Sequence, residues 1–224
     1  MKKYNGINYS IGRKIPPEFE NPIDDILLDV CDKLVPYCEE FKITPNFITI
    51  FRTILGIFTL YSFYFTSNFI FPIAGTIIFY FLDCLDGHLA RKTNQVSILG
   101  DYLDHYSDIS FYLILILIMV YKKYSNKIFV LIIILLLTYF SFIHLGLQQK
   151  NYKKIKNDIR EENKVTDEHN IILVDEIDEE LLVSLNSIHA LSENNITWTK
   201  YLGTGTLYTV LLIGIYYIQT HRQI

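Results

Sequence analysis

From about residue 47 onward, long apolar segments alternate with short polar turns. Each apolar segment has close to the roughly 20 residues that a helix needs to cross the hydrocarbon core of a bilayer. The segments are residues 47–66, 68–90, 98–121, 128–147 and 200–218. This pattern predicts an all-α fold, a polytopic membrane helical bundle with five to six transmembrane helices.

A different periodicity precedes the first apolar segment. Between residues 22 and 41, apolar residues recur at helical spacing and acidic residues occupy positions between them. Asn21 suits the N-cap and Pro22 the first helical position. We predict an N-terminal amphipathic interfacial helix, with packing on a soluble partner as the alternative. Residues 1–20 are polar and contain two consecutive prolines, which predicts an irregular leader.

The stretch between the last two apolar segments is strongly polar. Basic residues gather within 150–160 and acidic residues within 167–180, without a helical period. This pattern predicts a solvated loop over residues 148–198. A short amphipathic helix over residues 181–191 is a possible element within that loop.

Composition and charge narrow the class of protein. The chain has 224 residues, half of them hydrophobic, with 17 Tyr and 15 Phe, which is too apolar for an ordinary soluble domain. Its net charge of −4 gives no case for nucleic-acid binding. Cys31, Cys38 and Cys84 form neither a disulfide framework nor a zinc pattern. We expect two regions, a cytosolic leader with the amphipathic helix over residues 1–42 and a membrane-embedded domain over residues 43–218.

Four aspartates lie where the second apolar segment ends and the third begins: Asp83, Asp86, Asp104 and Asp108. A carboxylate at membrane depth costs at least ~2.5 kcal/mol near the bilayer centre, so it favours a functional interpretation. The first two are three residues apart and the last two are four apart, so each pair shares a helix face. Carboxylates brought this close need a cation to balance their charge. Oxygen ligands favour Mg²⁺, Mn²⁺ or Ca²⁺ over zinc.

The full pattern around these aspartates is D-x2-D-G-x2-A-R-x8-G-x3-D-x3-D, from Asp83 to Asp108. It resembles the signature of the CDP-alcohol phosphotransferases, the CDP-alcohol phosphatidyltransferase family. The T-P-N-x-x-T-x-x-R entry to the first span, from Thr44 to Arg52, is also similar to that family. The resemblance implies a phospholipid-synthesis enzyme that transfers a substituted phosphate from a CDP-linked donor to an alcohol acceptor and releases CMP. It also implies Mg²⁺ or Mn²⁺ as cofactor.

The resemblance assigns roles to the motif residues. Four are metal ligands: Asp83, Asp86, Asp104 and Asp108. Four belong to the site for the CDP donor: Gly87, Ala90, Arg91 and Gly100. Asp108 is also the catalytic general base, which takes the proton of the acceptor hydroxyl. Arg91 has the geometry for a bidentate phosphate contact, and the small residues leave room for the cytidine.

The roles of three further polar residues near the motif are not decided by the sequence. Arg52 either reaches the membrane interface or contacts a phosphate or a motif carboxylate. For Asp101 and His105, a local hydrogen-bonded pair at the helix entrance is favoured over a catalytic role. Family members typically have six core spans, so either residues 171–191 contain a short or re-entrant element or the sixth helix is absent.

The acceptor is not decided by the sequence. The D-G-H-x-A-R run followed by Asn94-Gln95 resembles phosphatidylinositol synthases, which use CDP-diacylglycerol with inositol. The pattern from Leu99 to Asp108, like the amphipathic helix, is closer to choline- and ethanolaminephosphotransferases, which use diacylglycerol as acceptor. The fourth and last spans contain no Lys or Arg apart from Lys200 at an edge. That absence disfavours an acceptor that carries a phosphate.

The distribution of basic residues predicts orientation. Most Lys and Arg lie on the side of the motif, whereas Lys122, Lys123, Lys127 and Arg222 lie on the opposite side. The positive-inside rule then places the active site at the cytosol, in the endoplasmic reticulum or the plasma membrane. The expected partners are membrane lipids, the CDP-linked donor and an alcohol or lipid acceptor, without nucleic acid. The family also suggests a homodimer.

Other functions remain as alternatives. Membrane prenyltransferases of the UbiA type also bind a diphosphate through paired aspartate motifs and Mg²⁺, but their two motifs lie about a hundred residues apart. An ion transporter explains intramembrane carboxylates, but not the glycines, alanine and arginine at family spacing. A degenerate, inactive homologue is disfavoured because all four aspartates are present.

Overall fold

The computed structural model describes residues 2–4, 7–9, 12–122, 127–163 and 196–221. Among these residues, five helices are long and apolar enough to cross a membrane: 45–65, 70–92, 98–121, 128–153 and 196–220. The predicted all-α membrane bundle is therefore confirmed, with each span within about six residues of its expected bounds. The possible elements within 171–191 lie outside the described residues.

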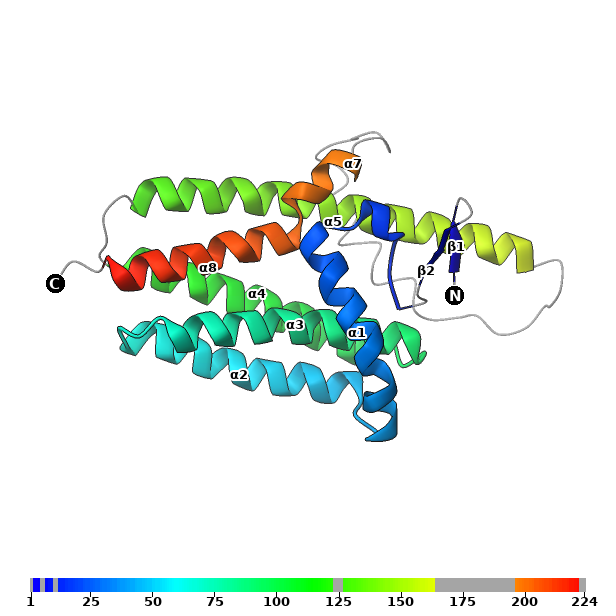
Figure 1. Ribbon diagram of the computed structural model, residues 1–224, viewed down its shortest axis with the longest axis horizontal. Helices are drawn as coiled ribbons and strands as arrows, with labels where there is room; N and C mark the ends of the chain where they lie inside the picture. The colour runs from blue at the N-terminus through cyan, green and yellow to red at the C-terminus, as the bar shows by residue number, and fades with distance from the viewer. Residues whose placement is uncertain (1, 5–6, 10–11, 123–126, 164–195, 222–224) are drawn as a thin grey trace.

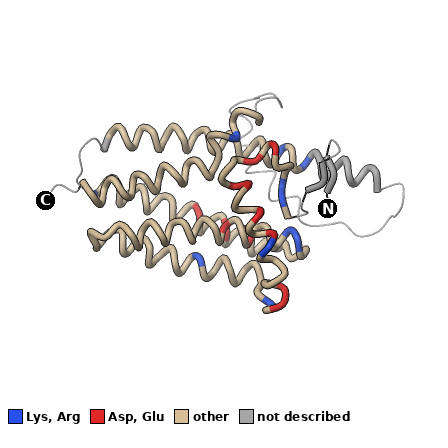
Figure 2. The backbone as a smooth tube through the Cα atoms, in the orientation of Figure 1, with Lys and Arg blue, Asp and Glu red and all other residues tan. Residues whose placement is uncertain are grey.

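The long helices run side by side and a further helix crosses one end of them (Figure 1). The bundle consists of α2 (Pro45–Phe65), α3 (Ile70–Lys92), α4 (Ile98–Tyr121), α5 (Lys127–Asn163) and α8 (Thr204–Thr220). Helix α1 (Pro22–Glu40) crosses the bundle where α3 ends and α4 begins, which we call the motif end. A short turn of helix, α7 (Ile196–Thr199), and a 3-10 turn, η3 (Lys200–Leu202), precede α8. Figure 2 shows the charged residues concentrated toward the motif end.

Helix α1 begins as the sequence predicts. The Asn21 side chain accepts a hydrogen bond from the backbone N–H of Ile23, and Pro22 occupies the first helical position. Its inward face buries Cys31, Val35 and Cys38 against Ile48, Leu85 and Leu89, and Leu28 is also buried. A second apolar face is exposed, with Ile26, Val30, Tyr37 and Phe41. Helix α1 thus packs on the bundle along one face and leaves a second apolar face on the outside, which a membrane interface would cover if α1 is the predicted interfacial helix.

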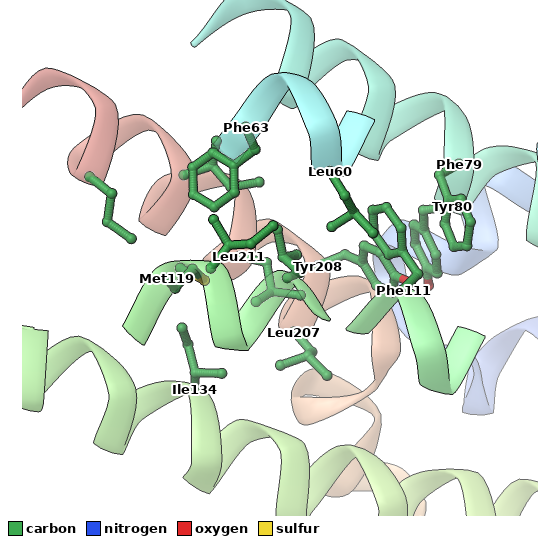
Figure 3. Close-up of a cluster of buried hydrophobic side chains, with 14 residues drawn as sticks. Leu60, Phe63, Phe79, Tyr80, Phe111, Met119, Ile134, Leu207, Tyr208 and Leu211 are labelled. Atoms are coloured by element: carbon green, nitrogen blue, oxygen red, sulfur yellow. The ribbon is translucent and has the colours of Figure 1, made fainter. Parts of the chain in front are cut away.

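The bundle core lies between α2, α3, α4, α5 and α8 (Figure 3). Two stacked aromatic pairs join these helices, Phe79 with Phe111 at 3.9 Å between ring centroids and Tyr80 with Tyr208 at 4.0 Å. Gly56 permits the first pair, because a Cβ there would lie 2.9 Å from the Phe79 ring. These contacts fix α3 and α4 against α2, and therefore fix the helix ends that carry the motif.

Two polar stretches differ from their predicted form. Helix α5 continues to Asn163, so residues 148–163 are helical rather than the start of a loop. This stretch has no Gly or Pro, and extending an existing helix avoids the cost of nucleation. The leader is likewise not wholly irregular, since β1 (Lys2–Tyr4) pairs with β2 (Ile7–Tyr9) and η1 (Pro17–Phe19) precedes α1.

A buried acid joins the leader to α5. The Glu20 side chain accepts a hydrogen bond of 2.8 Å from Gln148 Nε2, and Gln148 also contacts the buried His144. Burial raises the pKa of Glu20 to about 8, and the charge of Asp24 acts in the same direction. Burial also raises the pKa of Asp24, to about 6. The leader is therefore held in place by an acid that is protonated in the folded protein at neutral pH.

The raised pKa of Glu20 predicts a loss of stability as the pH rises. Between the ordinary value of 4.5 and about 8, the folded protein keeps a proton that the unfolded chain releases. We expect the unfolding midpoint in detergent to fall by about 5 °C between pH 6 and 8.5, a window that begins at the pKa of Asp24. Glu20→Gln keeps the hydrogen bond and should flatten this slope, whereas Glu18→Gln, at an exposed position, should not. An unchanged slope in Glu20→Gln would contradict the assignment.

Candidate active site

The turn between α3 and α4 brings the two halves of the motif together. Asn94 adopts a left-handed backbone conformation, with φ of 57°, and reverses the chain directly after α3. Ser97 caps α4 by accepting a hydrogen bond of 3.1 Å from the backbone N–H of Gly100. The last turns of α3 and the first turns of α4 consequently face each other, as the sequence predicts.

Three of the four predicted metal ligands converge. Carboxylate oxygens of Asp83, Asp104 and Asp108 lie within 4.8 Å of one another, and their side chains are partly exposed. The fourth, Asp86, is buried behind them and accepts a hydrogen bond of 2.7 Å from Thr49 Oγ1. Thr49 belongs to the T-P-N-x-x-T-x-x-R entry of α2, so that entry lines the same site.

Arg52 lies in the middle of the four carboxylates. Its side chain is fully buried, with guanidinium nitrogens 2.6 Å from Asp83 and 2.5 Å from Asp108. It also forms ion pairs with Asp104 and, at 3.3 Å through Nε, with Asp86. Of the open interpretations, contact with the motif carboxylates is the one that the structure shows. One positive charge against four carboxylates leaves the cluster with excess negative charge whenever all four are ionised.

The donor set fits a hard divalent cation. Three carboxylates from two helices present oxygens close enough to share one ion, and their side chains are partly exposed. Oxygen-only ligands of this kind suit Mg²⁺ or Mn²⁺ rather than a metal that prefers nitrogen or sulfur. Asp83, Asp104 and Asp108 are therefore the residues best placed to hold such an ion, with Asp86 behind them.

The glycines of the motif have specific neighbours. A Cβ at Gly87 would lie 3.1 Å from Nη1 of Arg91, so glycine leaves room for the guanidinium one turn further along α3. A Cβ at Gly100 would lie 2.5 Å from Oδ1 of Asn46, so this glycine allows α4 to approach the entry of α2. Ala90 is half-buried beside them. Gly100 therefore brings α2 and α4 together at the motif end, whereas Gly87 makes room for Arg91 on α3.

Arg91 has a partner that the sequence did not indicate. Its Nε donates a hydrogen bond of 2.7 Å to the backbone oxygen of Gly12 in the leader. Residues 12 and 91 are far apart in the chain, and no local pattern at Gly12 signals the contact. By contrast, His105 and Asp101 form the expected local pair, with His105 Nδ1 2.9 Å from the Asp101 carbonyl oxygen. Both of their side chains are about half exposed.

Comparison with known proteins identifies the family. The family model for CDP-alcohol phosphatidyltransferases matches residues 42–166, which is more than half of the chain and includes the whole motif. The chain belongs to the CDP-alcohol phosphatidyltransferase family. An archaetidylinositol phosphate synthase from Pyrococcus horikoshii is 34% identical over 93 residues, which cover 41% of this chain and 44% of that relative. The match thus spans less than half of the relative's length. No solved structure matches this chain.

Proposed function

We propose that this protein is a membrane-bound CDP-alcohol phosphotransferase of phospholipid synthesis. In the proposed reaction, the acceptor oxygen forms a bond to the phosphorus of the transferred group, the bond to the CMP phosphate oxygen breaks, and CMP leaves. One observation carries the proposal. The oxygens of Asp83, Asp104 and Asp108 converge within 4.8 Å in a partly exposed cluster, in a chain of this family.

The residues of the cluster have separate tasks in this proposal. Asp83, Asp86, Asp104 and Asp108 hold the divalent ion, and Asp108 also takes the proton of the acceptor hydroxyl. When bound, Mg²⁺ or Mn²⁺ supplies positive charge that polarises the diphosphate. Arg91 holds a phosphate of the donor, and Gly87, Ala90 and Gly100 keep the helices close enough to form the nucleotide site. Thr49 and Arg52 orient Asp86.

The name of the relative favours one combination of donor and acceptor. Archaetidylinositol phosphate synthase names a product built on an inositol phosphate. We therefore place a CDP-linked lipid donor with a polar alcohol acceptor such as inositol or serine first. The pattern from Leu99 to Asp108 keeps diacylglycerol with CDP-choline or CDP-ethanolamine as the second candidate. Family membership gives either of these more support than a UbiA-type prenyltransferase or an ion transporter.

The proposal also covers placement in the cell. Residues 1–46, 91–97 and 148–200 together carry most of the basic residues, which supports an active site that faces the cytosol. The endoplasmic reticulum and the plasma membrane are both consistent with this orientation. A homodimer, as the family suggests, is part of the same proposal.

Release of CMP by the purified protein tests the function. We expect release that requires Mg²⁺ or Mn²⁺, in detergent, with CDP-diacylglycerol plus inositol, inositol phosphate or serine. The second set contains CDP-choline or CDP-ethanolamine plus diacylglycerol, and activity there would select the second candidate. EDTA should abolish release in either set, because the carboxylates then lack the cation that the diphosphate needs. No release in both sets, with no metal-dependent binding of either donor, would refute the proposed function.

A further inference from the structure

The leader residues next to η1 are anchored at several points over the motif end. Arg13 is almost fully buried and pairs with Asp25 at 2.7 Å and Asp29 at 2.6 Å, both on α1. Ile15 is fully buried against Leu147 of α5 and Ile196 of α7. We call residues 12–15 the strap. Because the strap contacts three helices, the packing of the fold determines its position relative to the motif.

The strap contacts the part of α3 that carries the motif. The backbone oxygen of Gly12 accepts the hydrogen bond from Arg91 Nε. Gly12 also lies directly against the buried ring of His88, and a Cβ at residue 12 would overlap that ring. His88 is held in turn by Asp32 of α1, with 2.9 Å between Nε2 and Oδ1. Only glycine therefore allows the strap to reach Arg91.

This contact sets the direction of the Arg91 guanidinium. Since Nε points to Gly12, the Nη atoms lie along α3, with Nη1 close to Gly87. Asp83, Gly87 and Arg91 follow one another at intervals of four residues on α3, so the charged edge of Arg91 lies on the helix face that carries Asp83 of the carboxylate cluster. The charge of Arg91 interacts with those of Asp86 and Asp104.

The strap also brings a second cation to the same place. Lys14 follows Gly12 by two residues, and its charge acts on Asp104 and on Glu20. The hydrogen bond between Gly12 and Arg91 holds this part of the strap against α3, and the charges of Lys14 and Arg91 both act on Asp104 at this edge of the cluster. A diphosphate that approaches the carboxylates meets unfavourable charge, and cations at this edge compensate for it.

We propose that the strap completes the donor site, with the Gly12 carbonyl orienting Arg91 and Lys14 binding the donor diphosphate together with Arg91. The inference rests on the proposed function, because it takes the anion to be the diphosphate of a CDP-linked donor. It lies outside the family match, which begins at residue 42. The strap then contributes residues to the substrate site in addition to those of the motif.

The test measures binding of CDP to the full-length protein by calorimetry in Mg²⁺, together with donor kinetics. Lys14→Ala should weaken CDP binding by about tenfold, the loss expected for one charge-assisted contact. KM for the donor should rise by a similar factor while kcat changes little, and Lys14→Arg should restore both. Lys33→Ala removes a charge from an exposed position on α1 and serves as the matched control.

A second variant tests the orienting contact. Gly12→Val places a side chain against the His88 ring, which should displace the strap, weaken CDP binding and increase tryptic cleavage after Arg13 or Lys14. Bound CDP should slow that cleavage in the wild-type protein and have less effect in Gly12→Val. A donor-site role predicts this protection by CDP, whereas a purely structural role of the strap does not.

The outcomes separate this inference from the proposed function. Weaker CDP binding in Lys14→Ala without CMP release by the wild-type protein would support the strap and refute the reaction. CMP release with the same KM and CDP affinity in Lys14→Ala and Lys33→Ala would refute the strap alone. Absence of CDP binding in the wild-type protein would overturn the inference as well.

Discussion

Asp108→Asn is expected to lower the rate of CMP release by about a thousandfold, the middle of the range for loss of a general base. Asparagine keeps the size of the side chain and one oxygen, but it cannot take the proton of the acceptor hydroxyl. Asp108 lies one turn beyond Asp104 on α4, and its partly exposed carboxylate receives a hydrogen bond from Arg52. The carboxylate is thus held by a fixed cation and is accessible to an acceptor.

The experiment must distinguish the role of Asp108 as a base from its role as a metal ligand, since both are proposed. We would measure release over a range of Mn²⁺ concentrations, because a lost ligand is compensated by more metal and a lost base is not. Asp101→Asn is the matched control, an exposed acid one turn before Asp104 that contacts His105. It should retain activity near that of the wild-type protein. If Asp108→Asn turns over within about threefold of wild type at saturating metal, another group is the base.

Local patterns predict the carboxylate cluster because its geometry is mostly local. Spacings of three and four residues place each aspartate pair on one helix face, and a short turn forces the two pairs to meet. The cap at Ser97 and the left-handed Asn94 are also short-range features. The resemblance of this spacing to the family motif then suggests that the cluster binds a metal ion. Its assignment as a metal site stays a prediction, although three of its oxygens converge.

The long-range contacts of the site were not predictable in the same way. A helical position indicates on which face Arg52 lies, but its partners depend on how α2 packs against α3 and α4, which the sequence left open. The contact between Gly12 and Arg91 depends on a leader whose polar composition suggested irregular structure. On α1, Cys31, Val35 and Cys38 face the bundle while other apolar residues, Ile26 and Val30, stay exposed, and the packing of α1 on α3 decides between these faces. Tertiary packing, not local propensity, decides these details.

Arg52→Gln is expected to destabilise the protein strongly when divalent ions are removed with EDTA. The substitution leaves four carboxylates close together without the cation that contacts all of them. Removing one partner of a buried ion pair typically costs about 3–5 kcal/mol. Added Mg²⁺ should recover much of that loss, because an ion bound by the same carboxylates supplies positive charge and stabilises the folded state by mass action. The increase in unfolding midpoint from EDTA to Mg²⁺ should therefore be larger in Arg52→Gln than in the wild-type protein.

Arg13→Gln provides a matched comparison for this effect. Arg13 is also a nearly fully buried arginine with two aspartate partners, but those partners lie on α1 and outside the motif. Its loss should lower the unfolding midpoint by a similar amount in EDTA and in Mg²⁺, since no proposed metal ligand loses a partner. Equal Mg²⁺ responses in the two variants would mean that divalent ions stabilise the protein elsewhere than at the cluster. A larger response in Arg52→Gln would instead show that Arg52 and the metal ion balance the charge of the same four carboxylates. The stability of the fold would then depend on the bound ion once the arginine is removed.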